Sequence, residues 1–363
     1  MPESPIDRLA ARAEAVEREG LRRRLRPPRM TGPVTAQDGH RSLLVLSSND
    51  YLGLAQHPVV RRAWAGGGSG SSRLIAGSRE AHRDLEDALA DLFGRPALVF
   101  SSGYQANLAV LTTLFQAGDT VASDALNHAS IIDGLRLGQA SREVVPHGAL
   151  PARGTPGGVV EGLYSMDGDT LDLAGWRARV DALVVDEAHS VGVLGPGGRG
   201  QAAAEGVTPD VVVGTLGKAY GAAGAFICGP PALHELLISL GRSFVYTTAL
   251  AEPAARAALA GLSEATDERR EALADNVAFF RSGLADLGLE TRGTHHVVPV
   301  LLGAQTMAVA QRLDHAGVFV PGIRWPTVPR GMERLRFSLS AAHTRDQLRR
   351  TLDLLEAAVS SPE

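Results

Sequence analysis

The stretch Asp210-Val-Val-Val-Gly-Thr-Leu-Gly-Lys218-Ala-Tyr-Gly-Ala-Ala-Gly224 decides the fold. Its three consecutive valines predict a strand that is buried on both faces, and the glycines that follow predict a sharp turn around Lys218. The small neighbours of Lys218 leave room for a bulky planar group beside its amine. Lys218 is therefore a candidate Schiff-base lysine, although a solvated loop lysine explains most isolated Gly-Lys pairs.

The composition is that of an ordinary globular protein, with 363 residues, 44% of them hydrophobic and 21% charged. This length predicts two domains, or one large domain with an appendage. The net charge of −4 gives no reason to expect a nucleic-acid or membrane partner. A single cysteine, Cys228, rules out an intramolecular disulfide and a cysteine-rich zinc site. With neither a signal-peptide pattern nor an apolar run of about 20 residues, we expect a cytoplasmic protein without a metal site.

Short apolar runs alternate with helix-like segments through the first two thirds of the chain. This order predicts a mainly parallel sheet with helices on both faces. The expected strands are residues 97–100, 120–124, 143–145, 159–165, 181–186 and 211–213. Ligands of such sheets bind outside the carboxyl ends of the strands. The polar residues just after these strands are Ser102, Asn127, His128, Ser165, Asp186, His189, Thr215 and Lys218.

The two ends of the chain add smaller elements. Residues 5–25 predict an amphipathic helix that ends in the basic cluster Arg22–Arg26, which suits either an anionic substrate or a solvated helix end. Residues 251–289 look helical, and residues 297–363 predict a smaller α/β domain. Its strands are expected at 297–302, 318–320 and 335–339. Its last helix begins at Thr344 with the spacing of a capping box.

An acid, a histidine and a lysine at neighbouring strand ends could together hold a pyridine ring. Asp186 would keep the ring nitrogen protonated, Lys218 would bond an aldehyde carbon, and His128 could stack on the ring. The helix start at Ser102-Gly103-Tyr104 offers free backbone N–H groups for a phosphate. These are the requirements of pyridoxal 5'-phosphate, whose protonated ring withdraws electrons from a substrate carbanion.

Several ordered motifs resemble one family along the chain from about Arg22 to its end. The motifs are Asn49-Asp-Tyr-Leu-Gly-Leu, Gly70-Ser-Ser-Arg73-Leu-Ile-Ala-Gly, Asn127-His128-Ala-Ser, Glu161-Gly-Leu-Tyr-Ser165-Met-Asp-Gly-Asp, Asp186-Glu-Ala-His189-Ser-Val-Gly and Thr215-Leu-Gly-Lys218-Ala-Tyr-Gly. They resemble the α-oxoamine synthases, which are fold-type I pyridoxal-phosphate transferases. The resemblance implies an N-terminal segment (1–45), a large cofactor-binding domain with a mainly parallel sheet (46–250) and a smaller C-terminal α/β domain (251–363). It also implies a homodimer with the cofactor at the interface.

The resemblance further implies a role for each candidate residue. The catalytic residues would be Lys218, which forms the Schiff base and removes the substrate Cα proton, with His128 and Asp186. The cofactor contacts would be Ser102, Gly103, Tyr104, His128, Ser165, Asp186, His189, Thr215 and Lys218, with Thr247 and Thr248 from a partner subunit. Asn49 and Arg336 would receive the amino-acid carboxylate, and Arg22, Arg324 and Thr327 would lie near the acyl thioester.

The segments Ile323-Arg324-Trp-Pro-Thr327-Val-Pro and Arg334-Leu-Arg336-Phe-Ser-Leu-Ser-Ala-Ala-His are most similar to one kind of family member. These acyltransferases act in biotin biosynthesis and condense L-alanine with a pimeloyl thioester, carried by coenzyme A or acyl carrier protein. A member that joins glycine to an acetyl thioester, or a non-catalytic subunit, is the alternative. The stretch Gly195-Pro-Gly197-Gly-Arg-Gly200 matches a dinucleotide-binding pattern, which suggests an oxidoreductase. That pattern needs an acidic residue about twenty positions further on, and the chain has Thr215 there instead.

Overall fold

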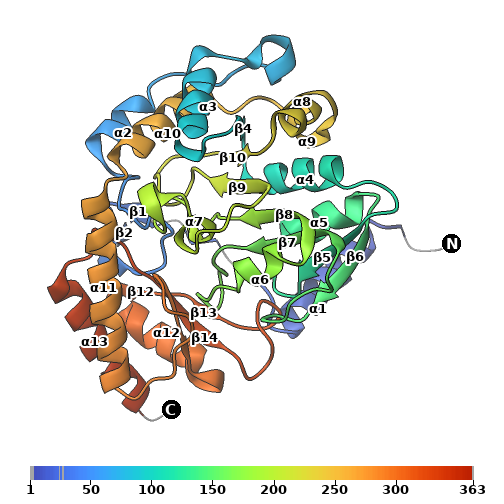
Figure 1. The fold of residues 1–363 in the computed structure, drawn as a ribbon. Helices are drawn as coiled ribbons and strands as arrows, with labels where there is room; N and C mark the ends of the chain where they lie inside the picture. The colour runs from blue at the N-terminus through green and yellow to red at the C-terminus, as the bar shows by residue number, and fades with distance from the viewer. Residues whose placement is uncertain (1–3, 24, 27, 362–363) are drawn as a thin grey trace.

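A seven-stranded sheet forms the centre of the computed structural model, which describes residues 4–23, 25–26 and 28–361 (Figure 1). In spatial order, its strands are β4 (Ala97–Phe100), β10 (Ala225–Cys228), β9 (Val211–Thr215), β8 (Val180–Asp186), β7 (Thr155–Glu161), β5 (Thr120–Asp124) and β6 (Ser141–Val145). Strand β10 runs antiparallel to both neighbours, and the other pairs are parallel. The predicted mainly parallel α/β sheet is therefore confirmed, with one unpredicted antiparallel strand.

Helices cover both faces of this sheet (Figure 1). They are α3 (Glu80–Phe93), α4 (Gly103–Leu114), α5 (Ala129–Leu137), α6 (Leu173–Arg177), α7 (Gln201–Ala204), α8 (Pro231–Leu240), α9 (Arg242–Val245) and α10 (Glu252–Glu264). Val211 and Val213 belong to the core beneath α4 and α5, whereas Val212 belongs to the core beneath α3 and α10. Because successive strand residues point to opposite faces, the valine run fills both cores at once, as predicted.

Two smaller sheets tie the ends of the chain together. The antiparallel sheet of β11 (Val297–Leu301), β14 (Arg334–Ser338) and β13 (Gly322–Ile323) packs with α11 (Asp267–Asp286), α12 (Thr306–His315) and α13 (Arg345–Ser360). The second sheet has the order β1 (Arg29–Met30), β2 (Thr35–Asp38), β3 (Arg41–Val45) and β12 (Val318–Phe319). Because β12 pairs in parallel with β3, the N-terminal segment is joined to the C-terminal part of the chain.

Several expected boundaries were wrong. The N-terminal helix is only α1 (Arg8–Arg18), and the helical stretch 251–289 is two helices that break at Ala265 and Thr266. The strand expected over 159–165 is β7, which begins earlier, at Thr155, and ends at Glu161.

The remaining helical segments are short. They are α2 (Pro58–Ala63), a π-helical turn at Arg73–Gly77 and 3-10 turns at Pro196–Gly198 and Gly303–Gln305. Among the described residues, no helix combines the length and the apolar composition that crossing a bilayer requires.

The predicted capping box at the start of α13 is confirmed. The Thr344 hydroxyl accepts a hydrogen bond from the Gln347 backbone N–H at 3.2 Å, and the Gln347 side chain accepts one from the Thr344 N–H at 2.9 Å. We expect Thr344→Ala to lower the free energy of unfolding by about 1 kcal/mol, because one N–H at the helix start loses its acceptor. Urea unfolding of Thr344→Ala and Thr344→Ser measures this. Equal losses in the two variants would contradict the assignment, because serine keeps the acceptor oxygen.

Candidate active site

Lys218 lies in the turn that follows β9, at the carboxyl edge of the large sheet. The turn closes with a hydrogen bond from the Gly221 N–H to the Lys218 carbonyl oxygen at 3.0 Å. Gly221 has φ +65°, and a side chain there would lie 2.3 Å from the Ala55 nitrogen, so only glycine fits. The Lys218 amine is half-buried and makes no hydrogen bond or ion pair within the described residues. Burial lowers its pKa to about 8, although the nearby carboxylates of Asp186 and Glu161 act in the opposite direction.

Asp186 ends β8, the strand next to β9, so the predicted juxtaposition of acid and lysine at neighbouring strand ends is confirmed. Its buried carboxylate accepts hydrogen bonds from the Asn107 side-chain amide at 2.7 Å and from the Ala188 N–H at 2.9 Å. Neither donor is charged. A buried carboxylate with only neutral donors favours a cationic partner, and the protonated nitrogen of a pyridine ring would be one.

Glu161 adds a second buried carboxyl group at this edge. It pairs with Asp186 in the register between β7 and β8. Burial raises the pKa of Glu161 well above its ordinary value, and the charge of Asp186 raises it further. Glu161 accepts a hydrogen bond from the His128 backbone N–H at 2.6 Å. It thereby fixes the loop that carries His128.

His128 caps the N-terminus of α5 and leaves its ring exposed. Its Nδ1 accepts the Ser130 N–H at 3.2 Å and lies 2.8 Å from the Ser130 hydroxyl oxygen. That same oxygen accepts a hydrogen bond from Asn107 at 2.9 Å, and Asn107 also donates to Asp186. One hydrogen-bonded chain thus links the two residues expected on the face and at the nitrogen of the ring.

His189 is buried at the same edge. Burial lowers its pKa well below the ordinary value, and the charges of Lys218 and Arg336 lower it further. Its Nδ1 lies 2.6 Å from the Tyr51 hydroxyl oxygen. The Tyr51 ring packs against His296 with ring centroids 4.1 Å apart.

The residues expected to hold a phosphate gather at the start of α4. Ser102 is the N-cap, and its hydroxyl accepts the Gln105 N–H at 3.3 Å. The Thr247 hydroxyl accepts a hydrogen bond from the Gln105 side chain at 3.2 Å, and the Thr248 carbonyl accepts one from Ser101 at 3.3 Å. Gly103 and Tyr104 form the first turn of α4 and expose its N-terminal end. The Tyr104 hydroxyl donates a hydrogen bond to Asp133.

Thr215 ends β9 close to the lysine turn. Its hydroxyl accepts the Gly217 N–H and donates to the Gly224 carbonyl, both at 3.2 Å. Thr247 and Thr248 lie beside Ser101 and Gln105 within one chain, and their contribution from a second subunit stays a prediction.

Arg336, on β14, lies beside Asn49, with which it was predicted to act, and it also contacts Ser165. Both Nη atoms of Arg336 lie 3.4 Å from the Asn49 side-chain oxygen, and Nε donates to the Ser165 carbonyl at 2.5 Å. The guanidinium is buried and has no carboxylate partner among the described residues. It can therefore bind the carboxylate of a small substrate.

The structure brings together only some of the residues expected near the acyl thioester, which were Arg22, Arg324 and Thr327. A cavity of about 170 Å³ is lined by Ser165 and Thr327, and the Thr327 hydroxyl accepts a hydrogen bond from Arg23 at 3.3 Å. Arg22 instead pairs with Glu17 at 2.7 Å, and Arg24 of the basic cluster falls outside the described residues. Arg324 follows β13, near the end of the N-terminal helical segment at Gly20.

Sequence reasoning gave no role to three residues that hold the site: Tyr51, Asn107 and Glu161. Tyr51 and Glu161 lie within the family motifs quoted above, and nothing else in the sequence pointed to them. Asn107 could have been noticed only as a polar residue in an apolar helix that starts at the expected phosphate site.

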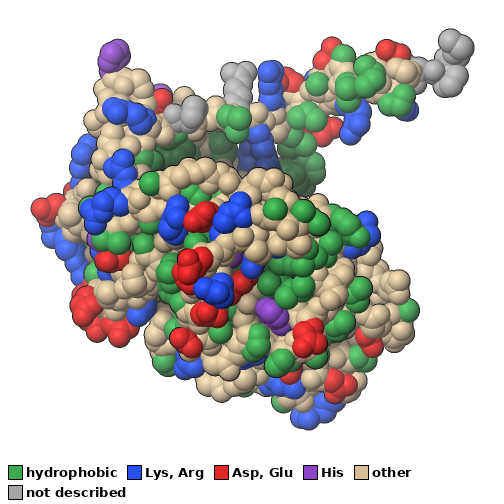
Figure 2. All heavy atoms as spheres, turned by 90° about the horizontal axis from the view of Figure 1, so that it is seen from above, with side chains coloured by type: hydrophobic (Ala, Val, Ile, Leu, Met, Phe, Trp, Pro, Cys, Tyr) green, Lys and Arg blue, Asp and Glu red, His purple; other side chains and the backbone are tan. Residues whose placement is uncertain are grey.

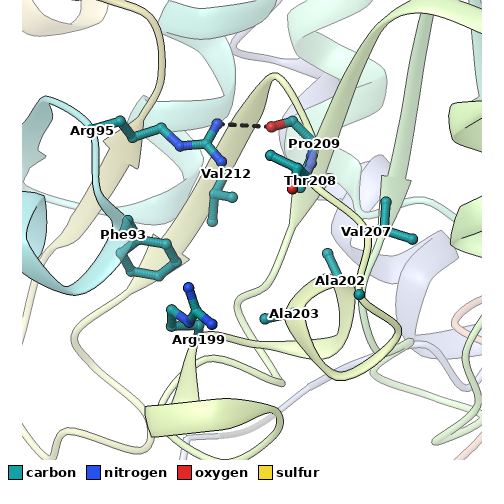
Figure 3. A pocket seen from close by; sticks show the side chains of 10 residues that line it. Phe93, Arg95, Arg199, Ala202, Ala203, Val207, Thr208, Pro209 and Val212 are labelled. Atoms are coloured by element: carbon teal, nitrogen blue, oxygen red, sulfur yellow. Dashed lines mark hydrogen bonds between the residues drawn. The ribbon is translucent and has the colours of Figure 1, made fainter.

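A larger cavity lies at the opposite end of β9 and is not this site (Figure 3). It measures about 320 Å³, and Figure 3 shows Arg95, Arg199 and Phe93 on one side of it and Thr208 and Pro209 on the other. None of the predicted site residues lines it. Its position beside the start of β9 separates it from Lys218, which follows the end of that strand.

The residues at the sheet edge fit pyridoxal phosphate. The unpaired amine of Lys218 suits the aldehyde, and the carboxylate of Asp186, which has only neutral donors, suits the ring nitrogen. The exposed ring of His128 and the free N-terminal end of α4 suit the ring face and the phosphate.

Comparisons with known proteins identify the family to which this chain belongs. A family model described as aminotransferase class I and II matches residues 41–355. The chain is 43% identical to an 8-amino-7-oxononanoate synthase of Burkholderia thailandensis, over 96% of this chain and 95% of the relative. A relative of the same name from Burkholderia mallei is also 43% identical, over 99% of this chain and 98% of the relative.

Solved structures with a similar fold point to the same kind of enzyme as the sequence relatives do. A serine palmitoyltransferase of Sphingomonas wittichii superposes with a TM-score of 0.88 at 32% identity, covering 98% of this chain and 97% of that one. An 8-amino-7-oxononanoate synthase of Francisella tularensis superposes with a TM-score of 0.75 at 29% identity, covering 87% and 98%. The chain therefore belongs to the aminotransferase class I and II family of pyridoxal-phosphate enzymes, and within it to the α-oxoamine synthases, which are C-acyltransferases.

Proposed function

We propose that this enzyme condenses L-alanine with a pimeloyl thioester to give 8-amino-7-oxononanoate, carbon dioxide and the free thiol of the acyl carrier. The reaction is a step of biotin biosynthesis. The observation that carries the proposal is the pairing of Lys218 and Asp186 at the ends of adjacent strands, in a chain whose curated relatives bear the name of this synthase.

Pyridoxal phosphate, when bound, supplies a protonated ring that withdraws electrons from the substrate Cα. Asp186 would hold the ring proton by its negative charge. His128 would pack on the ring, while His189 and Ser165 would contact the ring oxygen. Ser102, Gly103, Tyr104 and Thr215 would hold the phosphate, with Thr247 and Thr248 from a partner subunit.

Lys218 is the residue that would hold the aldehyde carbon, and its amine would serve as the base for the proton on the substrate Cα. Its lowered pKa supports this role, because an appreciable fraction of the amine is then a free base near neutral pH. Glu161 positions the loop of His128, and Asn107 positions both Asp186 and Ser130. Glu161 and Asn107 are therefore positioning residues, which orient the proposed cofactor contacts without making them.

The two substrates are proposed to bind on opposite sides of Ser165. Arg336 and Asn49 receive the alanine carboxylate through the two Nη groups that face Asn49. The acyl chain enters the cavity that Thr327 lines, and Arg324 lies next to Thr327, whose N–H donates to the Arg324 carbonyl at 3.0 Å. Arg23 joins Arg22 as a candidate contact for the anionic carrier, because it reaches Thr327 directly.

We also propose a cytoplasmic homodimer with an N-terminal segment of 1–45, a cofactor domain of 46–250 and a C-terminal domain of 251–363. Helix α1 supports the dimer, because it buries no residue and exposes Leu9 and Val16, and Ile6 is exposed in the turn just before it. Figure 2 shows it as an arm that projects from the body of the protein. An apolar stripe on a projecting helix is stabilised by a second surface.

A second candidate reaction uses another amino acid. The likeness to a serine palmitoyltransferase favours a test with L-serine and a palmitoyl thioester, and glycine with an acetyl thioester is the further family alternative. The purified enzyme is incubated with each amino acid and each thioester, on coenzyme A and on acyl carrier protein, and the products are identified by mass. We expect 8-amino-7-oxononanoate from alanine and the pimeloyl thioester. A product only from serine or glycine would replace the proposal.

Asp186→Asn removes the charge that keeps the ring proton and preserves the shape of the side chain. We expect the cofactor to remain bound and turnover to fall at least about 100-fold, the scale of losing one strong electrostatic contact in an active site. Steady-state assays with a measured cofactor content test this. Asp346→Asn, at an exposed carboxylate, is the control. Turnover close to that of the wild type would reject the role of Asp186.

Cofactor loading should follow the titration of Lys218. Only the neutral amine attacks an aldehyde, and burial lowers the Lys218 pKa from 10.5 to about 8. The loading rate of cofactor-free enzyme should therefore rise with pH and reach half its maximum near pH 8. The growth of visible absorption over a pH series measures it, and Lys218→Ala should show no such band. A midpoint above pH 10 would mean that the amine is solvated.

A further inference from the structure

A separate cavity of about 260 Å³ lies behind His189, between α11 and the loops at residues 193–194 and 294–296. Its apolar wall includes Val193, Leu273 and Val277. Its polar lining includes Arg270, Arg281 and the two histidines at 295 and 296. None of the residues assigned to alanine, acyl chain or cofactor lines this cavity.

Arg281 is the residue that gives this cavity a positive charge. Its Nε and Nη2 donate to the His295 carbonyl oxygen at 3.3 and 3.0 Å, and Nη2 also lies 3.2 and 3.3 Å from the carbonyls of Arg292 and Val297. Its Nη1 donates to no described residue. No carboxylate among the described residues pairs with it, and burial lowers its pKa to about 10. A half-buried cation held only by carbonyls is a ready partner for an anion.

The second arginine of the lining is already neutralised. Arg270 pairs with Asp267 at 2.9 Å and donates to the carbonyls of Gly192 and Ala265. The cavity thus offers one uncompensated positive charge beside an apolar wall. This combination selects a singly charged anion with an apolar body, such as an aliphatic monocarboxylate, over a phosphate ester.

His296 connects this cavity to the active site. Burial lowers its pKa to about 3, so the ring is neutral, and its Nε2–H donates to the His189 carbonyl at 2.9 Å. The His296 ring also packs on Tyr51, whose hydroxyl lies 2.6 Å from His189 Nδ1. One contact of His189 therefore comes from a residue that lines the cavity, His296, and another comes from Tyr51, which packs on His296.

We propose that this cavity is an effector site for an aliphatic monocarboxylate, with Arg281 as the anchor of the carboxylate and His296 as the link to His189. Val193, Leu273 and Val277 receive the hydrocarbon part. The link to the cofactor ring rests on the proposed function, whereas binding to the cavity does not.

Heptanoate is the probe, titrated into the cofactor-loaded enzyme by calorimetry while the visible absorption of the cofactor is recorded. We expect saturable binding and a shift of the visible band. Arg281→Gln should weaken the binding by about tenfold or more, the scale of one charge-assisted hydrogen bond. Ala278→Phe should abolish the binding, because Ala278 is exposed on α11 and lines the cavity, so a phenylalanine ring there would fill the space. Arg83→Gln, at an exposed arginine on α3, is the charge-matched control and should bind as the wild type does.

Three results would overturn the proposal. Absence of saturable binding to the wild type would reject the site, and unchanged binding in Ala278→Phe would place heptanoate elsewhere, including the acyl cavity. Binding that Ala278→Phe abolishes but that leaves the visible band unmoved in the wild type would reject the link through His296. A failure of the alanine reaction would leave the calorimetric result intact, so the two proposals fail separately.

Discussion

The structure depends on one electrostatic constraint, the burial of the Asp186 carboxylate at the end of a strand with only neutral hydrogen-bond donors. Burying a charge costs several kcal/mol unless a partner compensates. The chain compensates partly through Asn107, the Ala188 N–H and the amine of Lys218. In the proposed function, the protonated ring nitrogen of the cofactor would complete this compensation. The burial of Asp186 would therefore favour the pyridinium form of the ring, and the parallel pairing of β8 and β9 brings the acid and the lysine to one place.

The surrounding hydrogen bonds fix the relative positions of the side chains at the carboxyl edge of the large sheet. Asn107 on α4 reaches both Asp186 and Ser130, and Ser130 in turn fixes the ring of His128. Glu161 holds the backbone of the same loop. Since α4 also starts at the residues proposed to hold the phosphate, one helix orients the proposed contacts to the phosphate, to the ring nitrogen and to the ring face. A shift of α4 would thus disturb all three proposed contacts together, which gives the buried polar side chain of Asn107 a role in an otherwise apolar helix face.

The sequence predicted this edge well because the information there is local. The valine run fixes a strand with two buried faces, and the residues after each strand meet at one edge whatever the details of packing. The unpredicted parts depend on distant contacts. Tyr51 touches His189, 138 positions away, and nothing in a turn sequence signals it. Strand β10 was missed because a four-residue apolar run fits a helix or a strand equally well. Consecutive arginines cannot be told apart by composition, so only the structure selects Arg23 over Arg22 for Thr327.

The pairing of β3 with β12 gives the N-terminal segment its importance for the site. It joins residues 41–45 to the C-terminal part of the chain, and the next residues lead directly to Asn49 and Tyr51. Asn49 therefore reaches Arg336 of β14 from the opposite end of the sequence, and the proposed carboxylate site is assembled from both ends of the chain. Arg336 is in turn anchored to the carbonyl of Ser165, which follows β7 of the large sheet. A movement between the large sheet and the C-terminal elements would change the spacing of Ser165, Arg336 and Asn49, so the proposed amino-acid pocket senses that movement directly.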